Sequence, residues 1–103
     1  MIIDGEFEII NEFGLHARPS ASFVKMANQF ESKISVEYDN SVVDGKSIVG
    51  LLTLGIGTGE KLKITADGKD AKNAIKQLGK LISDGFGEVS RISKKNIDNL
   101  ISN

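Results

Sequence analysis

The sequence predicts one α+β domain in which an antiparallel sheet carries helices on one face and meets water on the other. Four segments have the pattern of strands: apolar and polar residues alternate in them, or they are short apolar runs between turns. Between them lie segments with the apolar spacing or the capping residue of a helix. Their order is β-α-β-β-α-β-α in a chain of 103 residues, enough for one domain with a small core.

The strands are predicted from residues that alternate in polarity. Phe7 and Ile9 alternate with glutamates, and the dipeptide Asp39-Asn40 separates two later strands as a tight turn does. Because each strand has one apolar and one polar face, we expect an antiparallel sheet with one covered face. The predicted strands lie at residues 6–9, 34–38, 42–43 and 61–66.

Three helices are predicted between and after these strands. Residues 17–30 place Phe23, Ala27 and Phe30 on one face, at the spacing i, i+4 and i+7. Residues 47–54 form a short helix that opens on Ser47, a favoured N-cap. A third helix has apolar residues at helical spacing and ends before Gly85 and Gly87; these residues are Ala71, Ala74, Ile75, Leu78 and Ile82.

The segment from Val89 to Asn103 has a weaker pattern. Four aliphatic residues fit one face of a further short helix, while frequent serine, asparagine and lysine equally fit a frayed end. The sequence leaves both readings open. The aliphatic residues are Ile92, Ile97, Leu100 and Ile101.

Composition excludes several classes of function. Thirteen basic and fourteen acidic residues give a net charge of −1, which is not the charge of a nucleic-acid-binding domain. The chain has no cysteine and one histidine, so it offers neither disulfides nor the ligands of a typical zinc site, and we expect no metal. The acidic N-terminus is unlike a secretory signal, and no apolar run approaches the ~20 residues of a membrane span. We therefore expect a soluble cytoplasmic protein without membrane insertion.

His16 is the main candidate for chemistry. A lone histidine is more often structural or merely exposed than functional, but this one directly precedes a predicted helix and is followed by Arg18 and Pro19. A helix start has free backbone N–H groups and a positive dipole end, which stabilise an anion. Arginine binds phosphate oxygens, and a neutral imidazole is a nucleophile. Because the residue before a proline avoids helical angles, Arg18 is a candidate N-cap with Pro19 as the first helical residue.

Two other catalytic patterns are not supported. The segment 55–59 is rich in glycine but is not followed by the Lys-Ser/Thr pair of a phosphate-binding P-loop, so we interpret it as a turn. A hydrolytic triad would have to use His16, and the sequence has no nucleophile-elbow pattern.

Two segments of the sequence resemble the motifs of one known family. They are the runs Gly14-Leu15-His16-Ala17-Arg18-Pro19-Ser20 and Lys46-Ser47-Ile48-Val49-Gly50-Leu51-Leu52. The first is similar to the active centre, and the second, at matching spacing, to the regulatory serine site of the HPr family, the histidine-containing phosphocarriers of the bacterial phosphoenolpyruvate:sugar phosphotransferase system. The resemblance covers about residues 1–88, beyond which many members of the family end. We therefore expect an HPr-like domain at 1–88 and an extension of unknown role at 89–103.

The resemblance implies a fold and a function. The fold is an open-faced β-sandwich with a four-stranded sheet of order 1-4-2-3 and three helices on one face. The function is phosphoryl transfer: enzyme I phosphorylates His16 on Nδ1, and enzyme IIA domains receive the group. Arg18 holds the phosphoryl oxygens, and Ala17 and Pro19 form the helix start at the site. The protein is then a covalent intermediate, not an enzyme, and needs no cofactor; we expect a monomer.

The second motif has a structural and a regulatory interpretation. A helix cap alone explains Ser47, whereas the resemblance permits its phosphorylation by an HPr kinase/phosphorylase. Ile48, Val49 and Leu52 are expected either to pack inward, as some must in so short a helix, or to form an apolar docking patch for partners. Alternatives to the sugar carrier are a regulatory, nitrogen-type HPr paralogue, a module that signals through Ser47, and a scaffold without phosphotransfer.

Overall fold

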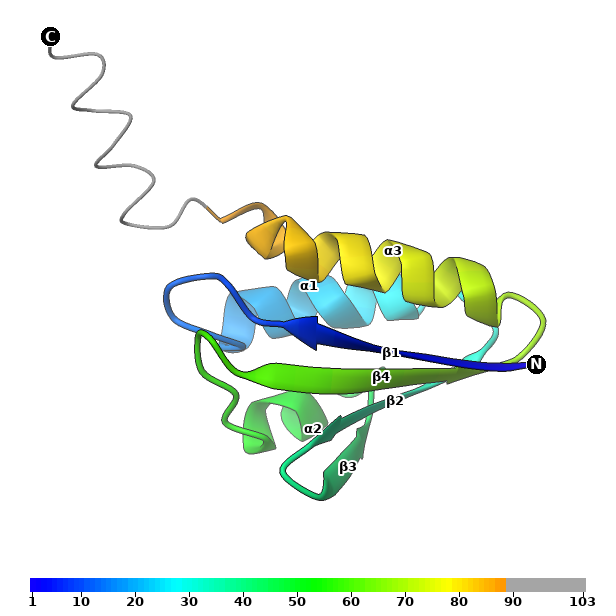
Figure 1. Ribbon diagram of the computed structural model, residues 1–103, viewed down its shortest axis with the longest axis horizontal. Helices are drawn as coiled ribbons and strands as arrows, with labels where there is room; N and C mark the ends of the chain where they lie inside the picture. Colours follow the sequence, from blue (N-terminus) through cyan, green and yellow to red (C-terminus); the bar gives the residue numbers. More distant parts are fainter. Residues whose placement is uncertain (89–103) are drawn as a thin grey trace, which may run out of the picture.

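The computed structural model describes residues 1–88 (Figure 1), and the expectations for residues 89–103 lie outside this part of the chain. It has the predicted order of strands and helices, followed by one turn of 3-10 helix. The elements are β1 (Ile2–Glu8), α1 (Ala17–Ala27), β2 (Lys33–Tyr38), β3 (Ser41–Asp44), α2 (Ile48–Thr53), β4 (Lys61–Asp67), α3 (Ala71–Ser83) and η1 (Gly85–Gly87).

The four strands form one antiparallel sheet in the order β1-β4-β2-β3. In β4 the inward residues are buried and the alternating lysines are exposed. The helices cover the apolar face, where α3 contacts β1 and β4 and α1 contacts both other helices. In Figure 1, α3 and α1 run along the sheet while α2 lies near β3. The predicted fold class and strand order are therefore confirmed.

The turn between β2 and β3 confirms the predicted hairpin. Asp39 and Asn40 have φ values of 51° and 67°, and they connect the facing residues Tyr38 and Ser41. Such left-handed angles at both central positions match the twist of a two-residue hairpin, and Asp and Asn tolerate them better than most residues.

Several predicted boundaries differ from the structure; β1 begins at Ile2 instead of residue 6, and two other differences concern core residues. Helix α1 ends at Ala27, although Phe30 still joins the core, because the N–H groups of Gln29 and Phe30 bond three residues back and tighten the chain into a turn. Ile9 lies beyond the end of β1, since its backbone bonds to Glu60 and Gly59 instead of continuing the ladder. Its side chain is nevertheless fully buried. Both residues were correctly assigned to the apolar face.

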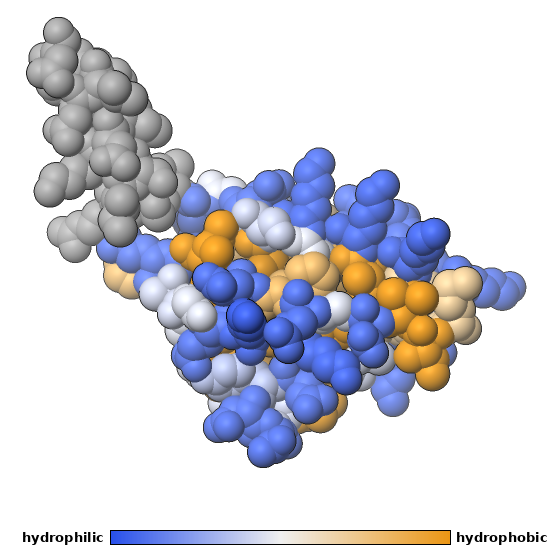
Figure 2. Space-filling model, viewed as in Figure 1, coloured by the Kyte–Doolittle hydropathy of each residue, from blue (hydrophilic) through white to orange (hydrophobic). Residues whose placement is uncertain are grey.

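The core lies between the sheet and the helices. The part of the chain that the structure describes has no helix with the length and hydrophobicity to cross a membrane. The face of the molecule shown in Figure 2 is mostly hydrophilic, with hydrophobic residues gathered in smaller areas. The largest fully buried apolar side chains are Phe23, Ile9, Ile34, Leu51, Leu62, Ile64, Leu78, Ile82 and Val36.

A polar connection fixes the start of α3. The carboxylate of Asp70 accepts hydrogen bonds from the backbone N–H groups of Glu31 and Ser32, at 2.8 and 3.0 Å, and from the Ser32 hydroxyl. These donors, with the Ser32 hydroxyl foremost, hold the pKa of the Asp70 carboxyl below its ordinary value. The contact ties the turn after α1 to the beginning of α3.

Candidate functional site

His16 is the N-cap of α1. Its backbone is extended, with φ −81° and ψ −167°, and its carbonyl accepts the first helical hydrogen bond from the N–H of Ser20 at 3.0 Å. Pro19 is thus the third helical residue, where it has no N–H to satisfy. The alternative with Arg18 as the cap is wrong: the avoidance of helical angles before proline is outweighed by the bond to His16 and by the burial of Pro19 and Ser20.

The loop before His16 is held by the glycine-rich segment. The N–H of Leu15 donates to the carbonyl of Ile56 at 2.9 Å, and Leu15 itself is buried. Gly14 has φ +69°, and a β-carbon there would lie 2.5 Å from that same carbonyl oxygen. Only glycine allows this close approach without strain. The turn around residues 55–59 therefore helps to fix the backbone that presents the histidine.

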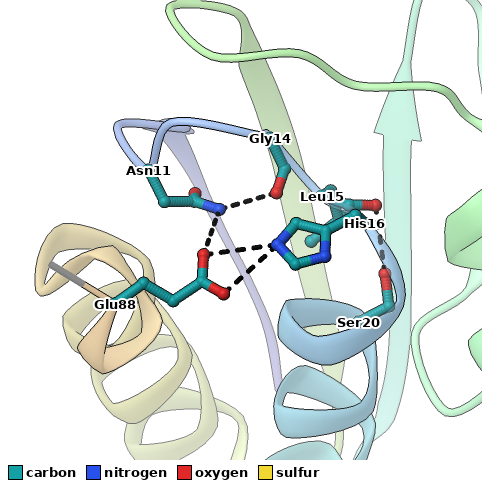
Figure 3. Close-up of polar contacts among 6 residues, drawn as sticks. All are labelled: Asn11, Gly14, Leu15, His16, Ser20 and Glu88. Carbon is teal, nitrogen blue, oxygen red and sulfur yellow. Dashed lines mark hydrogen bonds and ion pairs between the residues drawn. The ribbon is translucent and has the colours of Figure 1, made fainter. Parts of the chain in front are cut away.

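The His16 ring lies between an aromatic ring and a carboxylate. Its side chain is 38% exposed, and Nε2 lies 3.2 Å from one carboxylate oxygen of Glu88 and 3.4 Å from the other (Figure 3). Phe13 approaches edge-on, with ring centres 6.2 Å apart and planes at 88°. Within residues 1–88 the structure records no hydrogen bond to the other ring nitrogen, Nδ1.

Asn11 connects the loop to the same carboxylate. Its side-chain amide N–H group donates to the carbonyl of Gly14 at 2.6 Å and to Glu88 at 3.0 Å. Figure 3 shows the side chains of Asn11 and His16 converging on the Glu88 carboxylate. Asn11 is only 2% exposed, and its Oδ1 has no hydrogen-bond partner among the described residues. Asn11, Gly14, Glu88 and His16 thus form one polar cluster.

The roles of Asn11, Phe13 and Glu88 were not predicted from the sequence. Phe13 and Asn11 are close to His16 in the chain, so their proximity to it was a usable signal. Glu88 is 72 residues away, and only the packing of α3 brings its carboxylate to the ring. No local pattern in the sequence reports such a contact.

Arg18 lies at the rim of a hollow beside this cluster. The side chain is exposed, on the first turn of α1. The hollow has a volume of about 380 Å³, and its lining includes a guanidinium, two carboxylates and two aromatic rings. It is lined by Glu12, Phe13, Arg18, Phe86, Gly87 and Glu88. His16 and Arg18 are therefore brought together at one helix start, as the sequence predicts.

The second motif lies on α2, which packs against α1 and β3. Ser47 is the N-cap of this helix, and its hydroxyl accepts a hydrogen bond from the N–H of Gly50 at 3.0 Å. The structural interpretation of Ser47 as a cap is thereby confirmed.

The apolar residues of α2 are divided between core and solvent. Ile48, Val49 and Leu52 are 40%, 71% and 41% exposed. Leu51 and Leu54 face the core instead, at 0% and 9% exposure. The expectation that some of the first three residues pack inward is therefore wrong. In a helix this short, Leu51 and the C-cap residue Leu54 suffice to attach it.

The geometry suits a nucleophilic histidine that carries an anion. The helix start provides backbone N–H groups and a positive dipole end, and Arg18 adds a permanent charge. A ring nitrogen without an internal partner is available for bond formation. Within the described part of the chain, no group of three His, Asp or Glu side chains is arranged to hold a metal ion.

The comparisons with known proteins agree with this fold. Residues 3–84 match the PTS-HPr family model, described as the phosphorylation site of the HPr component. A multiphosphoryl transfer protein of Haemophilus influenzae is 46% identical over 87 residues, covering 82% of this chain and 17% of that protein. A phosphocarrier protein HPr of Neisseria meningitidis is 44% identical over 81 residues, covering 79% of this chain and 91% of that protein.

A solved structure of an HPr is also similar to this chain. The crystal structure of an HPr from Thermoanaerobacter tengcongensis aligns with a TM-score of 0.82 at 47% identity, covering 84% of this chain and 98% of that one. The fold and the site define an open-faced sandwich of the phosphocarrier class, with a histidine at the start of its first helix. The chain belongs to the PTS-HPr family, the phosphocarriers of the phosphotransferase system.

Proposed function

We propose that His16 is the residue that carries the phosphoryl group, accepting it on Nδ1 from phosphorylated enzyme I and passing it to enzyme IIA domains during sugar uptake. One observation carries the proposal. The ring stands half-exposed at the first turn of α1 with Nε2 against Glu88, so that Nδ1 is the nitrogen without a partner in residues 1–88. The names of the two relatives, a phosphocarrier and a multiphosphoryl transfer protein, support this pathway.

Each transfer step forms one bond to phosphorus and breaks another. The lone pair of Nδ1 forms a bond to phosphorus while the bond from phosphorus to the donor atom of enzyme I breaks, and the donor keeps that electron pair. In the second transfer an acceptor atom of the enzyme IIA domain forms a bond to phosphorus, the bond between Nδ1 and phosphorus breaks, and Nδ1 keeps that electron pair. The carrier therefore needs a nucleophilic nitrogen and an environment that tolerates a dianion.

The helix start provides that environment. Backbone N–H groups at Ala17 and Arg18 are not used within the helix, and the third residue, Pro19, has none. The Arg18 guanidinium can donate two parallel hydrogen bonds to phosphoryl oxygens. Because the backbone N–H groups of the helix start are in place before transfer, they can receive the phosphoryl group without a large rearrangement.

We propose that Ile48, Val49 and Leu52 form the surface on which partners dock. These residues are exposed on α2, which contacts the helix that begins at His16. A patch of this kind suits brief encounters, because a small apolar area gives modest affinity and rapid release. The sugar branch and the nitrogen-type branch share this chemistry. They are distinguished by whether the enzyme I of the sugar branch or that of the nitrogen-type branch labels the protein faster.

We also propose that Ser47 is a regulatory phosphorylation site, used by an HPr kinase/phosphorylase. The hydroxyl lies at the start of α2, directly before the exposed Ile48 and Val49. A phosphate is tolerated electrostatically at a helix start, while its charge beside an apolar docking surface disfavours binding of a partner. This proposal concerns regulation and leaves the His16 chemistry unchanged.

The decisive experiment is phosphoryl transfer from phosphoenolpyruvate through purified enzyme I to the protein. We expect one acid-labile phosphoryl group by intact-protein mass, and its loss in His16→Ala. Lys25→Ala, on the exposed last turn of the same helix, is the matched control and should react like the wild type. A His16→Ala protein that is folded and still becomes labelled would refute the assignment.

A further inference from the structure

We propose that Glu88 is a positioning residue for His16: its carboxylate accepts the Nε2–H hydrogen bond and thereby keeps the lone pair on Nδ1. The inference rests on the proposed phosphoryl transfer and names a residue outside both sequence motifs. This role of Glu88 explains why Nδ1 of the His16 ring reacts and Nε2 does not. Glu88 lies just after η1, at the far end of the described chain from the active-centre loop.

The geometry of the pair supports a hydrogen bond from the ring to the carboxylate. Nε2 lies 3.2 and 3.4 Å from the two oxygens of Glu88, so that either oxygen can accept. The Glu88 side chain is only 21% exposed and the His16 side chain 38%. The pair is therefore partly shielded from water, and shielding strengthens a contact of this kind relative to one at an open surface.

Asn11 also holds the carboxylate of Glu88. Its amide nitrogen bonds both to Glu88 at 3.0 Å and to the carbonyl of Gly14 at 2.6 Å. Because Asn11 is buried at 2% exposure, its amide cannot swing freely into solvent. The same loop therefore positions the backbone of His16 and, through Asn11, the group that orients its ring.

The carboxylate determines the protonation pattern of the neutral ring. A neutral imidazole carries one N–H, and a carboxylate acceptor beside Nε2 favours the form with the proton there. Nδ1 then has the free lone pair. When that lone pair bonds to phosphorus, the ring gains positive charge, which the adjacent carboxylate stabilises while the Nε2 proton stays in place. The carboxylate thus assists without entering the reaction.

Chemical phosphorylation tests this geometry without a protein partner. Phosphoramidate transfers its phosphoryl group to an imidazole nitrogen: the nitrogen forms a bond to phosphorus, the phosphorus–nitrogen bond of the reagent breaks, and ammonia leaves. The isomer formed is distinguished by phosphorus and nitrogen NMR. We expect the wild type to react almost wholly at Nδ1, and Glu88→Ala to give a substantial share of the Nε2 isomer.

Two further variants separate orientation from folding. Glu88→Gln keeps an oxygen that can accept the Nε2–H bond, so the isomer preference should be largely retained. Asp84→Ala removes an exposed carboxylate from the end of α3 without touching His16, so it should match the wild type. Nitrogen NMR of the folded proteins in mildly alkaline solution should show the Nε2–H form in the wild type and a mixture in Glu88→Ala.

The rate of labelling by phosphorylated enzyme I completes the test. We expect Glu88→Ala to be labelled about fivefold to tenfold more slowly than the wild type, because a charge-assisted hydrogen bond to the ring is lost. Unchanged isomer ratios and tautomers in folded Glu88→Ala would overturn the role of Glu88, even if enzyme I labels the wild type normally. A wild type that enzyme I does not label would instead refute the proposed function, whatever the isomer ratios.

Discussion

The hydroxyl of Ser47 accepts a hydrogen bond from the backbone N–H of Gly50 at 3.0 Å and so caps the helix that carries Val49, a side chain 71% exposed. One serine is therefore both a stabilising cap and a neighbour of the proposed docking patch. The two roles respond differently to substitution, which makes them separable by experiment.

The first prediction concerns this serine. Ser47→Ala removes the cap and should lower the free energy of unfolding by about 1 kcal/mol, while binding to unphosphorylated enzyme I is retained. Ser47→Asp keeps a capping oxygen and adds charge, so stability should be nearly unchanged and binding weaker. Denaturant unfolding and titration calorimetry measure the two quantities. An unaltered affinity of Ser47→Asp would contradict a regulatory switch at this position.

The second prediction concerns Arg18. Its guanidinium is exposed at the first turn of α1 and lines the hollow next to Glu88. Arg18→Ala should slow labelling by enzyme I about tenfold without abolishing it, since the nucleophile and the helix start remain. Arg18→Lys should recover only part of the rate, because an ammonium group lacks the paired donors of arginine. Rapid-quench kinetics measure these rates, and equal rates in all three proteins would exclude the proposed role.

The third prediction concerns the docking patch, and the chain contains a matched control for it. Val49 on α2 is 71% exposed and Val42 on β3 is 62% exposed. Val49→Ala should weaken binding to enzyme I about threefold, because apolar contact area is lost at the interface. Val42→Ala, which removes the same two methyl groups elsewhere, should bind like the wild type. Equal losses in both variants would show that α2 is not the docking element.

The fourth prediction concerns stability in acid. The hydrogen bonds from Ser32 and Glu31 lower the pKa of the Asp70 carboxyl in the folded state relative to its ordinary value of 3.8. A group with a depressed folded-state pKa contributes stability that is present above its unfolded pKa and is lost as the pH falls through the folded pKa. The wild type should therefore lose stability below about pH 4 more steeply than Asp70→Asn.

The measurement for Asp70 is urea unfolding as a function of pH. Asp4→Asn, an exposed carboxylate on the open face of β1, serves as the control and should follow the wild type. Near neutral pH, Asp70→Asn should be the less stable protein, because an amide accepts the same donors less strongly than a carboxylate does. Parallel curves for the wild type and Asp70→Asn would show that this contact contributes nothing that depends on protonation.

Much of this structure was predictable because it depends on short stretches of chain. Alternation in β4, the helical face of Phe23 and Ala27, the turn at Asp39-Asn40 and the cap at Ser47 each follow from a few neighbouring residues. The strand order did not follow from such patterns and came from the family resemblance. The errors occurred where tertiary packing overrides local preference, as at the first turn of α1 before Pro19.

The sequence by itself determined the order of elements, the capping of α2 and the presence of His16 and Arg18 at a helix start, because these features reflect local backbone chemistry. Only the tertiary structure decided that Glu88 meets both His16 and Asn11 and that Val49 faces solvent while Leu51 is buried. The physical reason is distance along the chain: α3 packs across β1 and β4, and this packing carries Glu88 to a ring 72 residues earlier.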